Sequence, residues 1–313
     1  MKNFYLGIDV GGTNIKAGIV DDENNIIDSL SLSTKSLLLS KTLAEAVKEI
    51  IFKVLSKNDA SIDDCLGIGI GVPGVVENAT GKILKADNLN IQNQDFLSGL
   101  KNSFNVPIKI ANDADVALLA ESKLGTGKNY KNIVMLTLGT GVGGSVMLGG
   151  KLLGLEQGVP FEVGHIKIQG NSNKCACGEI GCFETVASTK ALVLELKNAI
   201  SADPTSAIWK KYNISNIDGK TIFEFPKDYT ARETLKSYIK NVGAGLVSLV
   251  NLFKPELLII GGAISAQKEN LVNPLEIYVN RHNFFKQTGY NVKVVPASFL
   301  NDAGILGAKL LFC

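Results

Sequence analysis

Phe4-Tyr-Leu-Gly-Ile-Asp-Val-Gly-Gly-Thr-Asn-Ile-Lys-Ala-Gly-Ile-Val20 combines an apolar run, a glycine turn and a second, alternating run. The pattern predicts two β-strands joined at Gly11-Gly12-Thr13, with Asp9 at the end of the first strand. Glycines let backbone N–H groups approach a phosphate, Thr13 adds a hydroxyl, and the Asp9 carboxylate suits a metal ion or its water shell. Taken alone, the segment fits an ordinary glycine-rich hairpin equally well.

A second unit with the same pattern begins after Asn132. The apolar run 133–138 leads into the turn Gly139-Thr-Gly-Val-Gly-Gly144 and a further strand, Ser145-Val-Met-Leu148. Two such units, roughly 130 residues apart, indicate an internal duplication in which each lobe contributes one loop to a shared cleft. Neither unit is a Walker loop, because Gly-Lys-Ser/Thr is absent, and neither is a Rossmann fingerprint, because a strand follows the glycines. Paired hairpins that clamp the phosphates of a nucleotide fit both units.

The stretch between the two units has the pattern of an α/β lobe. A buried strand from Leu66 to Val72 ends at the rigid turn Gly71-Val-Pro-Gly74, whose backbone is suited to line a pocket, and Asn88 follows in a polar loop. Ser40 is expected to cap a helix with an apolar face. The residues of that face are Leu43, Val47, Ile50, Ile51, Val54 and Leu55.

Three polar residues crowd a predicted strand-to-helix junction. The short strand 107–111 runs into Asn112-Asp113-Ala-Asp115, which opens a helix. Asn and Asp are favoured N-caps, so one of these side chains is expected to cap the helix. A carboxylate placed there, near two glycine loops, can also take the proton from a hydroxyl that attacks phosphorus. The pattern alone leaves either Asp113 or Asp115 as that base.

A dense group of nitrogen and sulfur ligands follows the second unit. Its members, His165, Cys175, Cys177 and Cys182, fall within 18 residues. This is the number and kind of ligand that a closed tetrahedral zinc site requires, and glycines at 178 and 181 let the chain turn tightly. Cys-x-Cys spacing suits a local disulfide poorly, so a metal in a reducing compartment fits better. Glu162 and Glu184 bracket the cluster, and we expect the loop to present them.

Composition and charge bound the class of protein. The 313 residues are 45% hydrophobic, which suffices for a sizeable core in two lobes. The 32 Lys and Arg are balanced by 30 Asp and Glu and scattered along the chain, which argues against nucleic acid as a partner. The N-terminal apolar run is too short for a signal peptide, and no apolar run is long enough to span a membrane. We therefore expect a cytoplasmic protein with no membrane partner.

In their order along the chain, these motifs resemble the ROK family, named for repressors, open reading frames and kinases. The resemblance covers the whole chain, and the cysteine motif with its upstream Gly-His is highly specific. It implies an α/β, actin-like ATPase fold (ribonuclease H-like, hexokinase-type), with ATP, Mg²⁺ and a sugar between a small lobe (1–111 plus 300–313) and a large lobe (112–299). The motifs are Asp9-Val-Gly-Gly-Thr13, Gly71-Val-Pro-Gly74, Asn112-Asp113-Ala, Leu138-Gly-Thr-Gly-Val-Gly-Gly144, Glu162-Val-Gly-His165 and Cys175-x-Cys-Gly-x-x-Gly-Cys-x-Glu184.

The resemblance also implies a role for individual residues. Asp113 matches the catalytic base and is favoured over Asp115. The residues matching sugar contacts are Gly74, Asn88, Asn112, Asp113, Glu162, His165 and Glu184. Those matching the loops that bind ATP and Mg²⁺ are Asp9, Gly11, Gly12, Thr13, Asn14, Lys16, Gly139, Thr140, Gly141, Gly143, Gly261 and Gly262. Those matching ligands of a structural Zn²⁺ are His165, Cys175, Cys177 and Cys182.

A zinc ion held by four protein ligands has no open position, so its expected role is structural. If one ring nitrogen of His165 binds the metal, the other remains free to hydrogen-bond and the metal fixes its direction. The hypothesis is that zinc orders the sugar loop.

Together these features predict an ATP-dependent hexose kinase, glucokinase-like, that phosphorylates a sugar hydroxyl, O6 by expectation, and forms a homodimer or homotetramer. One alternative is the repressor branch, whose members carry a winged helix-turn-helix ahead of the first glycine loop; only eight residues precede Asp9 here. Another is a sugar sensor without kinase activity, which the presence of Asp113 and both glycine loops disfavours.

The identity of the sugar is open at the level of sequence. Glucokinase-like members usually have small residues before the glutamate that corresponds to Glu162, where this chain has Phe161. Glucose, fructose, mannose, N-acetylglucosamine and N-acetylmannosamine all remain candidates.

Overall fold

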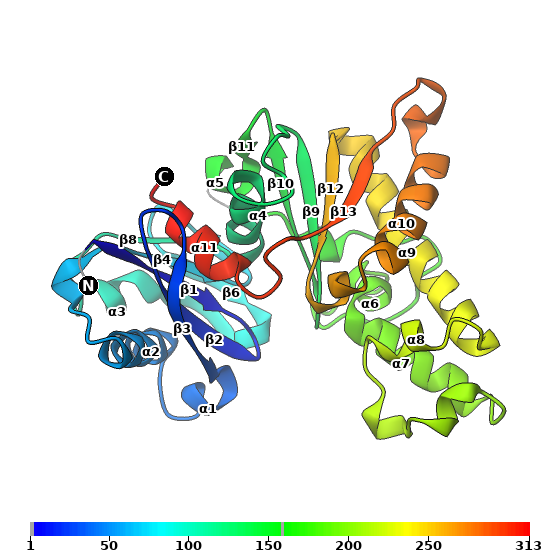
Figure 1. Cartoon of the computed structure of the whole chain (residues 1–313), viewed down its shortest axis with the longest axis horizontal. Coiled ribbons are helices and arrows are strands. Elements are labelled where there is room, and N and C mark those ends of the chain that lie inside the picture. Colours follow the sequence, from blue (N-terminus) through cyan, green and yellow to red (C-terminus); the bar gives the residue numbers. More distant parts are fainter. Residues whose placement is uncertain (1–2, 158–159) are drawn as a thin grey trace.

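The computed structural model describes residues 3–157 and 160–313. Two five-stranded mixed sheets form its centre, and helices cover them (Figure 1). This is the α/β class that the alternating strand and helix patterns predict.

The first sheet contains the predicted N-terminal hairpin. Its strands, in sheet order, are β3 (Ile26–Ser33), β2 (Asn14–Val20), β1 (Phe4–Val10), β4 (Cys65–Val72) and β8 (Ile108–Asn112). The β1–β2 and β2–β3 pairs are antiparallel, whereas β1–β4 and β4–β8 are parallel. Val10 lies opposite Ile15, so the glycine turn closes the hairpin where the sequence places it.

The second sheet repeats this arrangement. Its strands, in sheet order, are β11 (Lys151–Leu152), β10 (Val142–Leu148), β9 (Ile133–Leu138), β12 (Leu257–Gly261) and β13 (Lys293–Pro296). Here too the first three strands pair antiparallel and the last two are added in parallel. The identical order in both sheets is what the predicted duplication requires. The lobe limits near 111 and 300 stay a prediction.

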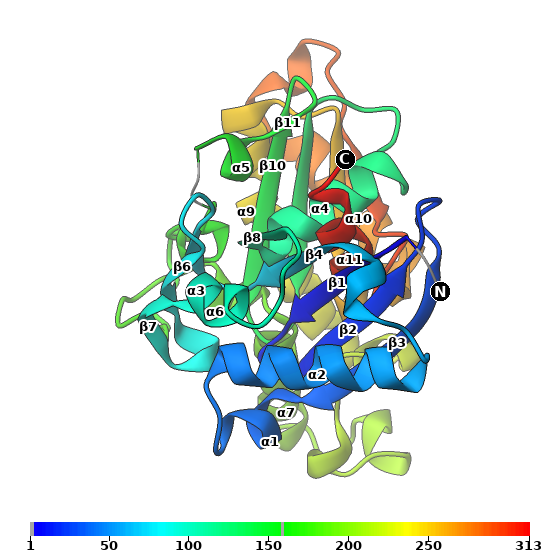
Figure 2. The same cartoon turned by 90° about the vertical axis from the view of Figure 1, so that its left-hand side faces the viewer.

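The helices and a small third sheet complete the fold. The third sheet is β5 (Val75–Glu77), β6 (Lys82–Ala86) and β7 (Ile91–Asp95). α2 packs on β2 and β3 (Figure 2). The helices are α1 (Thr34–Leu38), α2 (Leu43–Lys57), α3 (Phe96–Lys101), α4 (Asp113–Lys123), α5 (Leu153–Gln157), α6 (Glu184–Ala187), α7 (Thr189–Ser201), α8 (Thr221–Glu224), α9 (Tyr229–Phe253), α10 (Glu269–His282) and α11 (Ala303–Leu310).

Helices α4 and α11 pack against each other between the two sheets (Figure 1). Each follows the last strand of one sheet, and α11 returns to lie on β1 and β4. The approach is between backbones: a Cβ added at Gly69 would lie 1.9 Å from the Ala308 carbonyl oxygen, and one at Gly307 would lie 1.8 Å from that of Val116. Glycine at these positions therefore allows α11 to contact both the first sheet and α4.

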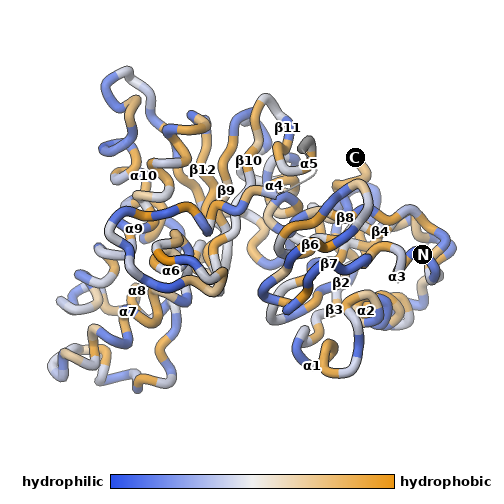
Figure 3. The backbone as a smooth tube through the Cα atoms, turned by 180° about the vertical axis from the view of Figure 1, so that it is seen from behind, coloured by the Kyte–Doolittle hydropathy of each residue, from blue (hydrophilic) through white to orange (hydrophobic). Residues whose placement is uncertain are grey.

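Three groups of buried apolar residues stabilise these layers. One fills the first sheet and α2, and one lies between the second sheet and α7, α9 and α10. The third joins the halves through Leu118 of α4, Ile305 of α11 and Ile133 of β9. Strand β12, buried along its whole length, is drawn mostly in the hydrophobic colour in Figure 3. Among the described residues, no helix combines the length and the apolar character needed to cross a membrane.

The predicted cap of α2 was wrong. Thr42, not Ser40, caps the helix: its side chain accepts a hydrogen bond from the Glu45 N–H (3.3 Å), and the Glu45 carboxylate accepts one from the Thr42 N–H (2.8 Å). This reciprocal capping box satisfies two N–H groups at once, which a hydroxyl at position 40 does not achieve.

We predict that Gly69→Ala destabilises the protein by about 3 kcal/mol, because the new methyl group meets backbone atoms that cannot move independently of α11. Gly71→Ala in the same strand is the matched control, since its Cβ would meet only side-chain atoms of Val116 at an ordinary 3.5 Å. Urea unfolding of both variants measures the difference. Equal midpoints for the two would contradict this account of the packing.

Candidate active site

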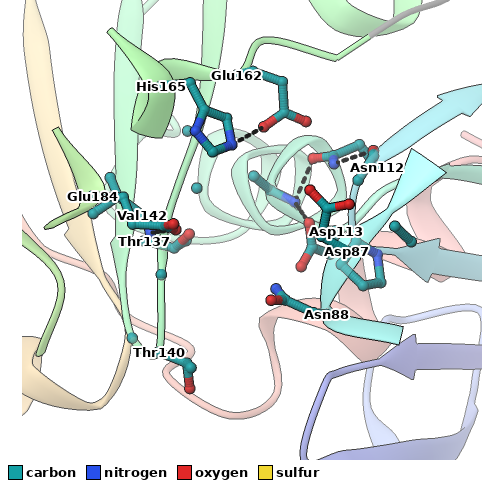
Figure 4. A pocket seen from close by; sticks show the side chains of 18 of the residues that line it. Asp87, Asn88, Asn112, Asp113, Thr137, Thr140, Val142, Glu162, His165 and Glu184 are labelled. Atoms are coloured by element: carbon teal, nitrogen blue, oxygen red, sulfur yellow. Dashed lines mark hydrogen bonds and ion pairs between the residues drawn. The ribbon is translucent and has the colours of Figure 1, made fainter. Parts of the chain in front are cut away.

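A cavity of about 400 Å³ brings the predicted residues together (Figure 4). Its lining includes every residue predicted to contact a sugar, namely Gly74, Asn88, Asn112, Asp113, Glu162, His165 and Glu184. It also includes part of the predicted nucleotide loops: Gly139, Thr140, Gly141, Gly143 and Gly262. Asp9, Gly11, Gly12, Thr13, Asn14, Lys16 and Gly261 lie outside the lining that the described residues form.

Asn112 fixes the start of α4 at this cavity. Its Oδ1 accepts hydrogen bonds from the N–H groups of Ala114 (2.8 Å) and Asp115 (3.4 Å), and its Nδ2 donates to the Gly74 carbonyl oxygen (3.0 Å). The cap among the three polar residues is therefore Asn112. Asp113 becomes the first residue of α4, at the positive end of the helix dipole, with its carboxyl group at the cavity.

Asp113 and Asp115 have different surroundings. Asp115 is 1% exposed, accepts a hydrogen bond from the Ser145 hydroxyl of β10, and packs against Gly154. Burial raises its pKa to about 6, opposed by the bond from Ser145. Asp113 lines the cavity, whereas Asp115 is enclosed between α4, β10 and α5. Geometry thus separates two aspartates that the residue pattern left equivalent.

The pKa of Asp113 is raised to about 7. Burial is the main cause, and the negative charges of Asp9, Glu162 and Asp115 act in the same direction, while a hydrogen bond from the Ala114 N–H opposes them. A carboxyl group with this pKa exists in both protonation states near neutral pH. It can therefore accept a proton and later release it.

Glu162, His165 and Glu184 lie across the space from Asp113 and Asn88 (Figure 4). The Nε2 atom of His165 is 4.0 Å from Oε2 of Glu162. Burial raises the pKa of Glu162, and the neighbouring His165 opposes that shift. Two carboxylates and an imidazole on this wall present the acceptors and donors that a polyhydroxylated ligand requires.

The four predicted metal ligands converge. Nδ1 of His165 is 3.8 Å from Sγ of Cys175, and the Sγ atoms of Cys177 and Cys182 are 3.7 Å apart. All four ligand atoms lie within 4.8 Å of one another. The thiols are free, because a disulfide would bring sulfur atoms to about 2 Å.

This cluster fits a closed zinc site. Zinc–sulfur bonds of about 2.3 Å in a tetrahedron separate the sulfur atoms by about 3.8 Å, close to the separations found here. The tight turns that the sequence predicts are present, with φ of 96° at Gly178 and 86° at Gly181. Nδ1 of His165 faces the thiols, so the opposite ring nitrogen, Nε2, faces Glu162. In addition, Cys177 itself lines the cavity. The cluster is therefore one wall of the candidate site.

The first glycine loop borders the cavity. A Cβ added at Gly12 would lie 3.5 Å from Cβ of Asn88, which lines it. Behind the loop, Nζ of Lys16 lies 3.6 Å from Oδ2 of Asp9 and donates to the Asn301 carbonyl oxygen (3.0 Å). Burial raises the pKa of Asp9, and Lys16 opposes that shift.

Sequence reasoning missed an ion pair at the cavity. Nζ of Lys85, on β6, lies 3.1 Å from Oδ2 of Asp87, in the turn that follows this strand, and both residues line the cavity with Thr137 of β9. The strands around Lys85 are short and carry no glycine motif, so no signal in the chain distinguishes these residues.

Sequence reasoning also missed two threonines that brace the glycine turns. The Thr34 hydroxyl donates to the Gly11 carbonyl oxygen (2.7 Å), and the Thr189 hydroxyl donates to that of Leu138 (3.0 Å). A signal for them does exist. Ser33-Thr-Lys35 and Ser188-Thr-Lys190 are the same tripeptide, each at the start of a helix that follows a duplicated unit.

Two sheets of identical strand order, with a glycine loop from each at or beside one cavity, define a protein of the actin-like ATPase fold. A crystal structure of a ROK family glucokinase from Streptomyces griseus, in complex with glucose and AMPPNP, matches with a TM-score of 0.85. The two chains are 29% identical, and the match covers 99% of each.

The ROK family model matches residues 5–313, and this chain belongs to the ROK family. The glucokinase of Streptomyces coelicolor is 30% identical over 309 residues, which are 97% of this chain and 95% of that protein. The xylose repressor of Caldicellulosiruptor bescii is 30% identical over 304 residues, which are 96% of this chain and 76% of the repressor. Its relatives thus include both enzymes and regulators.

We predict that the protein carries a single zinc ion per chain at the His165, Cys175, Cys177 and Cys182 cluster. Cys177→Ser should lower the zinc content and the melting temperature, because a hydroxyl is a poorer zinc ligand than a thiolate. Cys313→Ser, which changes an exposed thiol outside the cluster, is the control. Metal analysis and thermal unfolding measure both. A chelator-treated protein that keeps its melting temperature would contradict a structural role for the metal.

Proposed function

We propose that this protein is an ATP-dependent hexose kinase that transfers the γ-phosphoryl group of ATP to a sugar hydroxyl, O6 by preference. The observation that carries the proposal is the position of Asp113. Its carboxyl group, with pKa about 7, lies at the cavity opposite Glu162 and Glu184 and beside the second glycine loop. A base at this position would be next to both the sugar hydroxyl and the γ-phosphoryl group of ATP.

The residues of the cavity suit a hexose. Glu162, Glu184 and Nε2 of His165 would hold hydroxyl groups from one side, and Asn88 from the other. Asp113 would accept the proton of the attacking hydroxyl as its oxygen bonds to the γ-phosphorus and ADP departs. Because the pKa of Asp113 is near neutral, a substantial fraction of the carboxyl group is deprotonated at pH 7, and this form is a stronger base than an ordinary carboxylate.

The glycine loops suit a nucleotide. The first glycine loop and the loop 139–143 would face the phosphates, and Gly261-Gly262 would lie on the adenosine side, as the family resemblance implies. Mg²⁺, when bound near Asp9, would neutralise charge on the transferring phosphoryl group. The Streptomyces griseus relative, described as a complex with glucose and AMPPNP, supports both ligands.

Glucose is our first candidate for the sugar, because glucokinases are among the relatives of this chain. Phe161 is the feature that sets this cavity apart from the family pattern. Its ring lines the cavity and packs edge-on against Phe253 with centroids 6.0 Å apart, so its position is fixed by the core. We also propose that the protein is cytoplasmic, in keeping with its free thiols, and that it forms a homodimer or homotetramer, as the family resemblance implies.

We predict that Asp113→Asn lowers turnover by about a hundredfold to ten-thousandfold, since the amide cannot accept the proton. ADP release is measured with ATP and Mg²⁺ across glucose, fructose, mannose, N-acetylglucosamine and N-acetylmannosamine. Asp115→Asn is the matched control: it can still accept the Ser145 bond and lies away from the cavity, so its loss should stay below about tenfold. If no sugar gives turnover while one binds, the regulator alternative, favoured by the xylose repressor relative, replaces the kinase.

We also predict that kcat/KM rises with pH and levels off above about 7. The sign follows from the chemistry: a general base acts when deprotonated, so lowering the pH below the pKa removes the active form, roughly tenfold per pH unit. In Asp113→Asn the residual rate should lose this dependence. Because burial already disfavours the charged carboxylate, that variant should be no less stable at pH 8, which thermal unfolding checks. A flat profile in the unmodified enzyme would exclude Asp113 as the base.

A further inference from the structure

The side chain of Glu184 touches three parts of the site at once. Its Oε2 accepts a hydrogen bond from the Val142 N–H of the second glycine loop (3.2 Å), and its Oε1 lies 3.6 Å from Sγ of Cys175 in the metal cluster. It also lines the cavity, with Val142 beside it (Figure 4). One carboxylate therefore connects the proposed sugar wall, the metal cluster and the proposed nucleotide loop.

Gly141 provides the space that this carboxylate occupies. A Cβ at Gly141 would lie 2.2 Å from Oε2 of Glu184 and 3.3 Å from its Cδ. By contrast, a Cβ at Gly139, two residues earlier in the loop, would meet nothing within 4 Å. The absence of a side chain at 141 thus leaves room for the Glu184 carboxylate, in addition to any room that it leaves for a phosphate.

The residues that follow Glu184 hold the same loop from outside. The Thr189 hydroxyl donates to the Leu138 carbonyl oxygen (3.0 Å), and the Lys190 N–H donates to that of Gly139 (3.4 Å). Between Glu184 and Lys190, the chain therefore contacts both sides of the turn. The loop and the wall that carries Glu184 form one hydrogen-bonded unit.

We propose that Glu184 is a positioning residue for the 139–144 loop and thereby couples the sugar site to the nucleotide site; the coupling rests on the function proposed above. A sugar hydroxyl bound to this carboxylate restricts its motion, and the bond to Val142 transmits that restriction to the loop. By linkage, a nucleotide that orders the loop must tighten sugar binding by the same factor.

Gly141→Ala is the variant that tests the proposal. The new methyl group meets only the end of a flexible side chain, so the protein should fold with Glu184 turned away from Val142. Gly139→Ala is the matched control for adding a methyl group to this loop. Glu184→Ala removes the acceptor, and Glu184→Gln retains an oxygen that can accept the Val142 bond.

Two quantities are measured: amide hydrogen exchange at Val142, resolved by NMR without ligands, and the glucose Kd by calorimetry with and without AMPPNP and Mg²⁺. We expect exchange at Val142 to quicken about tenfold or more in Gly141→Ala and Glu184→Ala, and to stay near the original rate in Gly139→Ala and Glu184→Gln. The glucose Kd should rise about tenfold in Gly141→Ala but not in Gly139→Ala, and of these two glycine variants only Gly141→Ala should lose the effect of nucleotide on that Kd.

Unchanged exchange at Val142 in Glu184→Ala would overturn the positioning role. Equal glucose affinities in the two glycine variants would overturn the coupling. If exchange responds as expected but the unmodified protein binds neither glucose nor another hexose of the panel, the positioning role stands and the proposed function fails.

Discussion

The close contact of α11 with α4 is the constraint on which the candidate site depends. At Gly307 the two helices approach through their backbones, so α4 has little freedom to shift or rotate. The other sides of α4 are also held: Asp115 accepts a bond from Ser145, and Glu121 accepts bonds from the Ser298 and Phe299 N–H groups (2.6 and 2.9 Å). Since Asp113 is the first residue of this helix, its direction is set by packing remote from the cavity.

The cavity gathers several acidic side chains, which costs folding free energy. Asp87, Asp113, Glu162 and Glu184 line it together with Lys85. Burial, reinforced by the neighbouring carboxylates, raises the pKa values of Asp113 and Glu162. The N-terminus of α4 offsets part of this cost. Core packing does not require this group of carboxyl groups. Because they suit the binding of hydroxyl groups and of a cation, we attribute their grouping to function.

Much of this fold could be predicted from sequence, because its signals are local. Alternating apolar residues and glycine pairs locate both hairpins, and the capping box Thr42-x-x-Glu45 is the local signal that marks the start of α2 more reliably than a single hydroxyl at Ser40. The signal for the four predicted metal ligands is equally local, since they fall within 18 residues of sequence. By contrast, no local signal distinguishes Asp113 from Asp115, because the difference depends on which face of α4 is covered by β10. Lys85 lines the cavity because the small third sheet packs beside it, and no sequence pattern predicts that packing.

The duplication explains how two similar halves produce one asymmetric site. Both carry Asn-Asp-Ala at the start of the helix after their last strand, Asn112-Asp113-Ala114 and Asn301-Asp302-Ala303. In the first half, β3 runs directly into α1. In the second, residues 153–188 separate β11 from α7, and this stretch carries the metal cluster, Glu162 and Glu184.

Glu162 and Glu184 of that stretch lie across the cavity from Asp113, so Asp113 is the copy that faces their carboxylates. The start of α11 instead meets the first glycine loop unit, where Gly304 packs against Asp9. The insertion between a strand and a helix thus makes one copy of a repeated aspartate a candidate base, while the other, Asp302, occupies the N-cap position of α11 without a side-chain capping bond.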